Sequence, residues 1–165
     1  METIRIKRLS DDAFIPMKAT DGAACFDLYV PRETAVQKGR NIIPLDLSIE
    51  LPHGTYAEIR PRSGFSAKGM EDVHGCRRDA DVLHGCIDED FRGNMGVIIR
   101  SEDFFILGKG TRVAQMLICN YMPCELVEVE ELSSTDRGEG GFGSDRKSTR
   151  LNSSHTQKSR MPSSA

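Results

Sequence analysis

A strict alternation of apolar and polar side chains constrains this chain more than any other feature. Residues 45–51 carry Leu or Ile at every second position, with Asp46, Ser48 and Glu50 between them. Successive side chains of a β-strand point to opposite faces, so the apolar set shares one face and the polar set the other. The alternation therefore predicts a strand with one face in the core, and it does not fit a helix.

Similar short segments recur along the chain. Further strands are predicted over residues 55–60, 97–100, 104–107, 112–119 and 125–130, most of them bounded by Gly, Pro, Asn or Asp. No long segment keeps a helical stripe. A chain of 165 residues has room for one ordinary domain. The pattern predicts an all-β domain, either a sandwich or a barrel.

Two regions fall outside this pattern. Residues 60–71 form a basic loop that we expect to contain one helical turn. Residues 133–144 hold four glycines flanked by serines, together with Arg137 and Phe142. Such a segment has no core of its own, which predicts a flexible arm that closes over a site as a lid.

Charge and cysteine content exclude several classes of protein. The net charge is −3 and the isoelectric point about 5.8, so no global positive field attracts nucleic acid. No apolar run reaches the roughly 18 residues of a membrane span, and the amino terminus lacks a secretory signal. Five cysteines, an odd number, indicate reduced thiols. We therefore expect no nucleic-acid or membrane partner and a cytoplasmic location, with the nucleus possible in a eukaryote.

A doubled His-x-Cys pattern leaves one alternative open. His74 with Cys76 and His84 with Cys86 could supply four ligands to zinc. Structural zinc sites more often use tight Cys-x-x-Cys pairs. Buried cysteines and surface histidines are the favoured interpretation.

Three polar groups point to one chemistry. Residues 62–64, Arg-Ser-Gly, offer a guanidinium, a hydroxyl and open backbone amides to an anion such as phosphate. Arg137, with Ser144 at the end of the arm, offers a second anion site. Asp88 follows a predicted apolar segment and is a candidate general base. Together they predict a nucleotide phosphohydrolase.

Five ordered segments resemble the motifs of the trimeric dUTPase family. They are residues 22–28 (Gly-Ala-Ala-Cys-Phe-Asp-Leu), 61–69 (Pro-Arg-Ser-Gly-Phe-Ser-Ala-Lys-Gly), 85–94 (Gly-Cys-Ile-Asp-Glu-Asp-Phe-Arg-Gly-Asn), 110–116 (Gly-Thr-Arg-Val-Ala-Gln-Met) and 137–144 (Arg-Gly-Glu-Gly-Gly-Phe-Gly-Ser). The resemblance implies a distorted, jelly-roll-like β-barrel with a flexible C-terminal arm. It also implies hydrolysis of dUTP to dUMP and pyrophosphate, which limits uracil in DNA and supplies dUMP for dTMP synthesis.

The resemblance assigns roles residue by residue. Asp88 matches the aspartate that deprotonates the water attacking the α-phosphorus. Gly85 and Ile87 would lie beside the uracil, and Phe91, where the family usually has Tyr, under the deoxyribose. The implied contacts to phosphate and to the closed arm involve Arg62, Ser63, Gly64, Gln115, Arg137, Phe142, Gly143 and Ser144.

The family also implies a cofactor and an assembly. Mg²⁺ would be bound mainly by the substrate phosphates, with Asp27 acting on it through water. The family is homotrimeric, and its arm caps a neighbouring subunit. The implied segments are a barrel domain over 1–132, an arm over 133–144 and a disordered tail over 145–165.

The chain departs from the family pattern after Ser144. Asp145 would bring a carboxylate near the triphosphate, and residues 145–165 contain five Lys or Arg, one acid and little apolar content. They resemble translated adapter or vector sequence, so we expect a non-native tail. Two alternatives remain, a dCTP deaminase and a dUTP-binding regulatory protein of the same fold with weak or no turnover.

Overall fold

The fold of the chain is almost entirely antiparallel β-structure. The computed structural model describes residues 2–143, so the predicted tail and Ser144 lie outside the described residues. The elements are β1 (Arg5–Arg8), β2 (Phe26–Tyr29), β3 (Thr34–Val36), β4 (Gly39–Pro44), β5 (Leu47–Glu50), β6 (Thr55–Arg60), α1 (Ser63–Lys68), β7 (Met70–Glu71), β8 (Arg77–Arg78), β9 (Ala80–Val82), β10 (Gly85–Ile87), β11 (Gly96–Ser101), β12 (Phe105–Leu107) and β13 (Arg112–Asn120). The predicted all-β class is confirmed.

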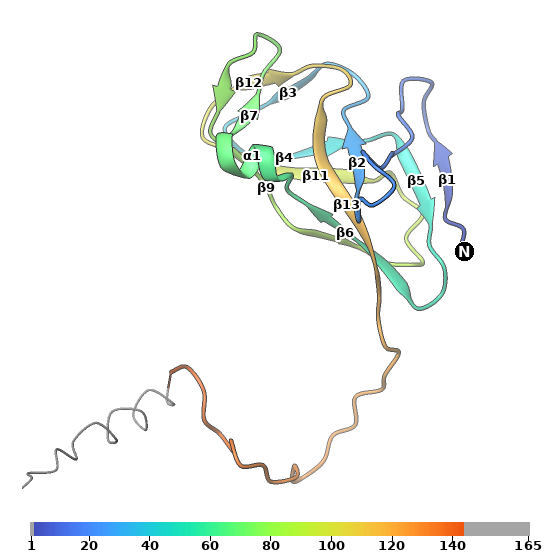
Figure 1. The fold of residues 1–165 in the computed structure, drawn as a ribbon, viewed down its shortest axis with the longest axis vertical. Helices are drawn as coiled ribbons and strands as arrows, with labels where there is room; N and C mark the ends of the chain where they lie inside the picture. The colour runs from blue at the N-terminus through green and yellow to red at the C-terminus, as the bar shows by residue number, and fades with distance from the viewer. Residues whose placement is uncertain (1, 144–165) are drawn as a thin grey trace, which may run out of the picture. The chain divides into compact units, whose positions relative to one another are not determined.

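Two larger sheets organise the part of the chain before residue 125. One has the strand order β10-β6-β13-β2, and the other has the order β4-β11-β9. Figure 1 shows β13, the longest strand, lying between β2 and β6. Three two-stranded pairs, β1-β5, β12-β3 and β7-β8, complete the pairing. Each ladder is antiparallel, as expected for short strands joined by turns.

The core confirms the alternation that the sequence shows. Leu45, Leu47 and Ile49 are at most 1% exposed. Their polar neighbour Ser48 is also buried, because its hydroxyl donates to the backbone carbonyl of Arg92 at 2.7 Å. The loop that follows Asp88 therefore covers Ser48 on the second face of this strand, whereas Glu50 on the same face is exposed.

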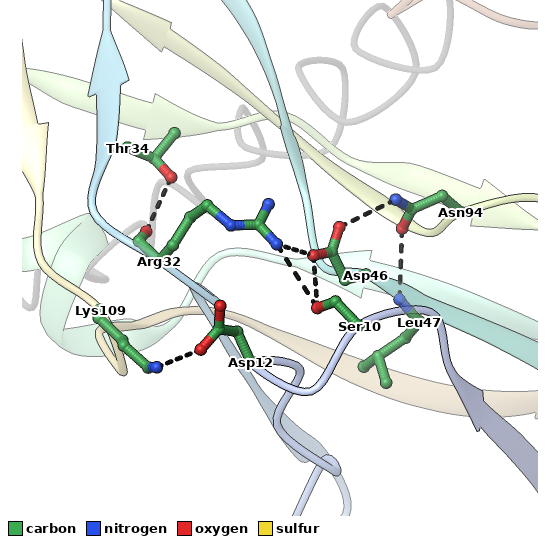
Figure 2. Close-up of polar contacts among 8 residues, drawn as sticks. All are labelled: Ser10, Asp12, Arg32, Thr34, Asp46, Leu47, Asn94 and Lys109. Carbon is green, nitrogen blue, oxygen red and sulfur yellow. Dashed lines mark hydrogen bonds and ion pairs between the residues drawn. The ribbon is translucent and has the colours of Figure 1, made fainter.

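Asp46 links this strand to the rest of the domain (Figure 2). Its buried carboxylate accepts hydrogen bonds from the Ser10 hydroxyl at 2.7 Å, from the Arg32 guanidinium and from the Asn94 amide at 3.2 Å. Asn94 in turn accepts the backbone N–H of Leu47 at 3.3 Å. Asp46 has a φ of 54°, an uncommon conformation for a residue with a side chain. These three partners of the carboxylate hold that conformation in place.

One predicted strand is wrong. Residues 125–130 form no regular element, and Leu126 and Leu132 are 96% and 88% exposed. A strand needs a partner for its backbone N–H and C=O groups, and the described part of the single chain offers this segment none. The chain divides into two units after Cys124, each described separately, so the predicted boundary at residue 132 stays a prediction.

A hairpin follows the region where a basic loop with one helical turn was predicted. The helical turn is present as α1, and β7 and β8 follow it as a tight pair. The turn of the hairpin is organised by Asp72, whose buried carboxylate accepts the N–H groups of His74 and Cys76 and the Arg78 guanidinium. No helix in residues 2–143 is long and apolar enough to cross a membrane.

Candidate active site

Three of the predicted motifs meet at one end of the larger sheet. Gln115 of β13 lies opposite Asp27 of β2 on one side and opposite Arg60 of β6 on the other. Arg62 and Ser63 directly follow β6 and begin α1. The ladder register therefore brings the candidate metal-side carboxylate, the candidate phosphate-binding loop and Gln115 together. We call this group the phosphate cluster: Asp27, Arg62, Ser63, Arg112 and Gln115.

Side-chain contacts tie the phosphate cluster together. Arg62 Nε donates to Asp27 Oδ1 at 3.0 Å, and Arg112 Nη1 lies 3.5 Å from Asp27 Oδ2. Gln115 Nε2 donates to the Pro61 carbonyl at 2.9 Å, which fixes the start of the loop. Ser63 remains exposed and available to a ligand. Two guanidinium groups against one carboxylate leave this cluster with a net positive charge, which suits phosphate.

The predicted uracil-binding residues line a second feature, a pocket of about 200 Å³. Gly85, Ile87, Asp88 and Phe91 all contribute to its wall, and we call it the base pocket. The remaining wall is mainly apolar and comes from β6, β11 and the segments beside them: Ile59, Leu83, Met95, Gly96 and Ile98. A small, mostly apolar pocket with one carboxylate at its edge suits a planar base with few polar groups.

Gly93 gives the Phe91 ring its position. A Cβ atom built on Gly93 would lie 2.6 Å from the tip of the ring, so any larger residue would displace the ring. The ring is 42% exposed and covers the glycine backbone. Gly93 was not predicted to be a site residue. The only signal for it in the sequence is its position two residues after the aromatic Phe91.

The loop that carries Asp88 is anchored by its neighbour Glu89. Glu89 accepts the backbone N–H of Gly54 at 2.6 Å and lies 2.8 Å from His53 Nδ1. The hydrogen bond with His53 is the main cause that lowers the pKa of Glu89, and the hydrogen bond from Gly54 adds to it. The hydrogen bond from the Tyr121 hydroxyl to Glu89 raises the pKa of the tyrosine. Glu89 thus joins the turn after β5, the end of β13 and the candidate base.

The two candidate regions lie far apart within one chain. β10 pairs with β6 so that Ile87 is opposite Ala57, which places Asp88 level with Tyr56. Arg62 lies six residues further along, between the end of β6 and the start of α1. At about 3.3 Å per residue, the separation is about 20 Å. Within one chain, the candidate base and Arg62 therefore lie at opposite ends of β6.

The arm is described only within its own unit. Arg137 Nε donates to the Gly140 carbonyl at 2.8 Å, and Gly138 N donates to the Thr135 carbonyl at 3.1 Å, so the arm forms two local turns. Phe142 is exposed and, like Gly143, has a positive φ. Its aromatic ring is free to contact another surface.

Comparison with known proteins shows the family of the chain. A family model described as dUTPase matches residues 11–145. A deoxyuridine 5'-triphosphate nucleotidohydrolase of Oryza sativa subsp. japonica is 42% identical over 144 residues, covering 86% of this chain and 79% of the relative. The chain belongs to the dUTPase family. A relative with the same description from Hydrogenobaculum is 40% identical over 145 residues. The aligned region covers 84% of this chain and 94% of the relative.

The solved structures confirm the dUTPase fold. A mutant dUTPase of Staphylococcus bacteriophage 80alpha with dUpNHpp superimposes with a TM-score of 0.76 over 88% of this chain and 99% of its own. Its sequence identity is 24%, so it supports the fold alone. The predicted distorted β-barrel of the dUTPase family is therefore confirmed.

The described residues do not form a ready-made metal site. Within residues 2–143, no group of three or more His, Cys, Asp or Glu side chains could hold an ion, and this covers the doubled His-x-Cys pattern. Asp27 is the residue that the family resemblance assigns to contact with the metal ion. Its carboxylate already pairs with Arg62 and Arg112. The donor set does not fit a metal ion held by the protein itself.

Proposed function

We propose that this chain hydrolyses dUTP to dUMP and pyrophosphate. The observation that carries the proposal is Asp88 at the edge of the base pocket, with Gly85, Ile87 and Phe91 in the same wall. A carboxylate at the mouth of a pocket that fits a pyrimidine can deprotonate a water beside the nucleotide phosphates. The names of the relatives support dUTP as the substrate.

Each predicted site residue has a role in this proposal. Asp88 takes the proton of the water that attacks the α-phosphorus. The backbone of Gly85 and Ile87 binds the uracil, so that a C5 methyl or a C4 amino group does not fit. Phe91 packs under the deoxyribose and excludes a 2′-hydroxyl.

The phosphates are assigned to cationic and small residues. Arg62, Ser63 and Gly64 bind the phosphate chain, and Gln115 orients phosphate or water. The arm closes over the nucleotide, with Arg137 on the terminal phosphates and Phe142 stacked on the uracil. Gly143 allows the closing turn, and Ser144 reaches phosphate.

We propose that the working form is a homotrimer with shared active sites. Asp88 and Arg62 lie at opposite ends of β6, with a backbone separation of about 20 Å, and this supports the supply of one of the two groups by a second copy. The exposed apolar residues Leu126, Val127, Val129 and Leu132 support self-association through the segment after β13.

Mg²⁺ is proposed as a cofactor that arrives with the substrate. Phosphate oxygens and water are the ligands that this ion prefers, and it neutralises part of the triphosphate charge. A structural neighbour, the dUTPase of phage phi11, is described with a structural Mg(II) ion. The role predicted for Asp27 is contact with this ion through water.

The activity is tested by pyrophosphate release from dUTP, with dCTP, dTTP and UTP as comparisons. We expect release from dUTP alone and its loss in Asp88→Asn, with nucleotide affinity retained. Asp12→Asn is the control, because it removes a carboxylate from an exposed ion pair with Lys109. Turnover that survives Asp88→Asn would disprove the assigned base. Binding of dUTP without turnover by the unaltered chain would support the regulatory alternative.

Shared sites predict recovery of activity in mixed assemblies. Asp88→Asn and Arg62→Ala are each expected to be inactive alone. After the two variants are unfolded and refolded together, sites that combine Asp88 of one copy with Arg62 of another are intact. We expect the mixture to regain a measurable fraction of the activity. An inactive mixture that still contains mixed trimers, shown by native mass spectrometry, would place both groups of one site in a single chain.

A further inference from the structure

Asp27 occupies an unusual position between two guanidinium groups. Its side chain is 10% exposed and faces Arg62 Nε at 3.0 Å and Arg112 Nη1 at 3.5 Å. The three residues come from β2, from the segment after β6 and from β13. Arg62 also donates to the Arg112 carbonyl at 3.4 Å. Two cations are thus held close together by one buried carboxylate and one carbonyl.

The geometry leaves the cationic groups available to an anion. Asp27 accepts from the Nε of Arg62, which fixes the plane of that guanidinium. No hydrogen bond from Arg62 Nη2 is found among residues 2–143. The side chains of Arg62 and Arg112 are 24% and 51% exposed, whereas the carboxylate beneath them is nearly covered. The outer surface of the group is therefore cationic.

We infer that Asp27 is a positioning residue that orients Arg62 and Arg112 toward the phosphate chain, and that Arg112 is a further phosphate-binding residue. The inference rests on the proposed hydrolysis of dUTP. Without its counter-charge, the two guanidinium groups would repel each other and separate. Asp27 thus acts through the arginines, and Arg112 acts by direct contact.

The same contacts argue against Asp27 as a metal ligand. Its charge is already compensated by Arg62 and Arg112, and a divalent cation beside these arginines would be repelled. The ion-pair role and the metal role predict different behaviour when metal is absent. The distinction can be measured on the full chain without turnover.

The test is calorimetric titration of inorganic pyrophosphate into the full chain in the presence of EDTA. We expect Arg112→Ala and Asp27→Asn each to weaken binding about tenfold, as loss of a charge-assisted contact would. Arg112→Lys keeps the charge but not the planar fork, so it should recover only part of the affinity. Glu50→Gln is the control, because it removes one carboxylate from the exposed pair with Arg5 and should bind as the unaltered chain does.

Two results would overturn the inference. One is unchanged pyrophosphate affinity in Arg112→Ala, a half-exposed position where we expect normal folding, checked by circular dichroism. The other is an Asp27→Asn chain that binds pyrophosphate normally in EDTA but needs more Mg²⁺ for half-maximal turnover, as a metal ligand would. Failure of the proposed function would give a different result from failure of this inference. The unaltered chain would then bind pyrophosphate normally but release no pyrophosphate from dUTP.

Discussion

At the scale of the residue, Asp46 shows how one carboxylate secures an unfavourable backbone conformation. Its φ of 54° is disfavoured for any side chain, and Ser10, Arg32 and Asn94 together offset that cost (Figure 2). Asn94 also lines the base pocket. The network therefore connects the stability of the turn before β5 with the shape of the candidate site.

Replacement of Asp46 by Ala should destabilise the protein strongly. The change leaves the Ser10 hydroxyl, the Arg32 guanidinium and the Asn94 amide without their acceptor and keeps the unfavourable φ. We expect the free energy of unfolding to fall by about 3 kcal/mol, measured by urea denaturation. Asp12→Ala, in the exposed pair with Lys109, should change it by less than about 1 kcal/mol. Equal effects of the two substitutions would contradict the role assigned to the network.

At the scale of the element, the β7-β8 hairpin is held against the end of α1. Gly69, directly after α1, has a φ of 75°, and a Cβ atom there would lie 2.4 Å from the Arg78 carbonyl oxygen. Gly75, in the turn of the hairpin, has a φ of 76° but open space around it. The two glycines share a positive φ and differ in the room available to a side chain.

This pair predicts different costs for the same substitution. Gly75→Ala should cost about 1 kcal/mol, because only the positive φ opposes a side chain. Gly69→Ala should cost clearly more and raise the KM for dUTP, because the hairpin must move away from α1, which carries Ser63. Urea denaturation and steady-state kinetics measure the two effects. A Gly69→Ala chain no less stable than Gly75→Ala would show that the contact is not close in solution.

At the scale of the whole molecule, several carboxylates contribute stability that depends on pH. The main cause that lowers the pKa of Asp46 is the hydrogen bond from Ser10. The backbone N–H of Cys76 lowers the pKa of Asp72 in the same way, and the Tyr56 hydroxyl lowers the pKa of Glu58. A lowered pKa in the folded state means that the ionised form favours folding. This contribution is complete above the pKa of the unfolded chain and is lost as the pH falls through the folded value.

The protein should therefore be least stable in acid. We expect the midpoint of thermal unfolding, at fixed protein concentration, to be nearly constant from pH 7 to about pH 5 and to fall steeply below about pH 4, where unfolded Asp and Glu protonate. Asp72→Asn should lower the midpoint at pH 7 and make the decline less steep. An equal midpoint at pH 7 and pH 3 would refute the contribution of these groups.

Local pattern was enough to predict the all-β class and five of the thirteen strands in residues 2–143, namely β5, β6, β11, β12 and β13. The alternation over residues 45–51 and the helical turn after Pro61 were predicted because each depends on neighbouring residues only. The strand predicted over residues 125–130 has the same local pattern and is wrong in this chain, since its pairing depends on a partner that the sequence does not specify. The β7-β8 hairpin has strands of only two residues each, which are too short to leave a periodic signal.

The sequence by itself determined the all-β class and the residue types of the candidate site, including Asp88, Arg62, Ser63 and Gln115. Only the tertiary structure showed that Asp27 holds both Arg62 and Arg112, since these contacts join residues 35 and 85 positions apart. It also placed Asp88 and Arg62 at opposite ends of β6. The physical reason is that side-chain alternation is a property of the local chain, whereas such distances depend on the register with which distant strands pair.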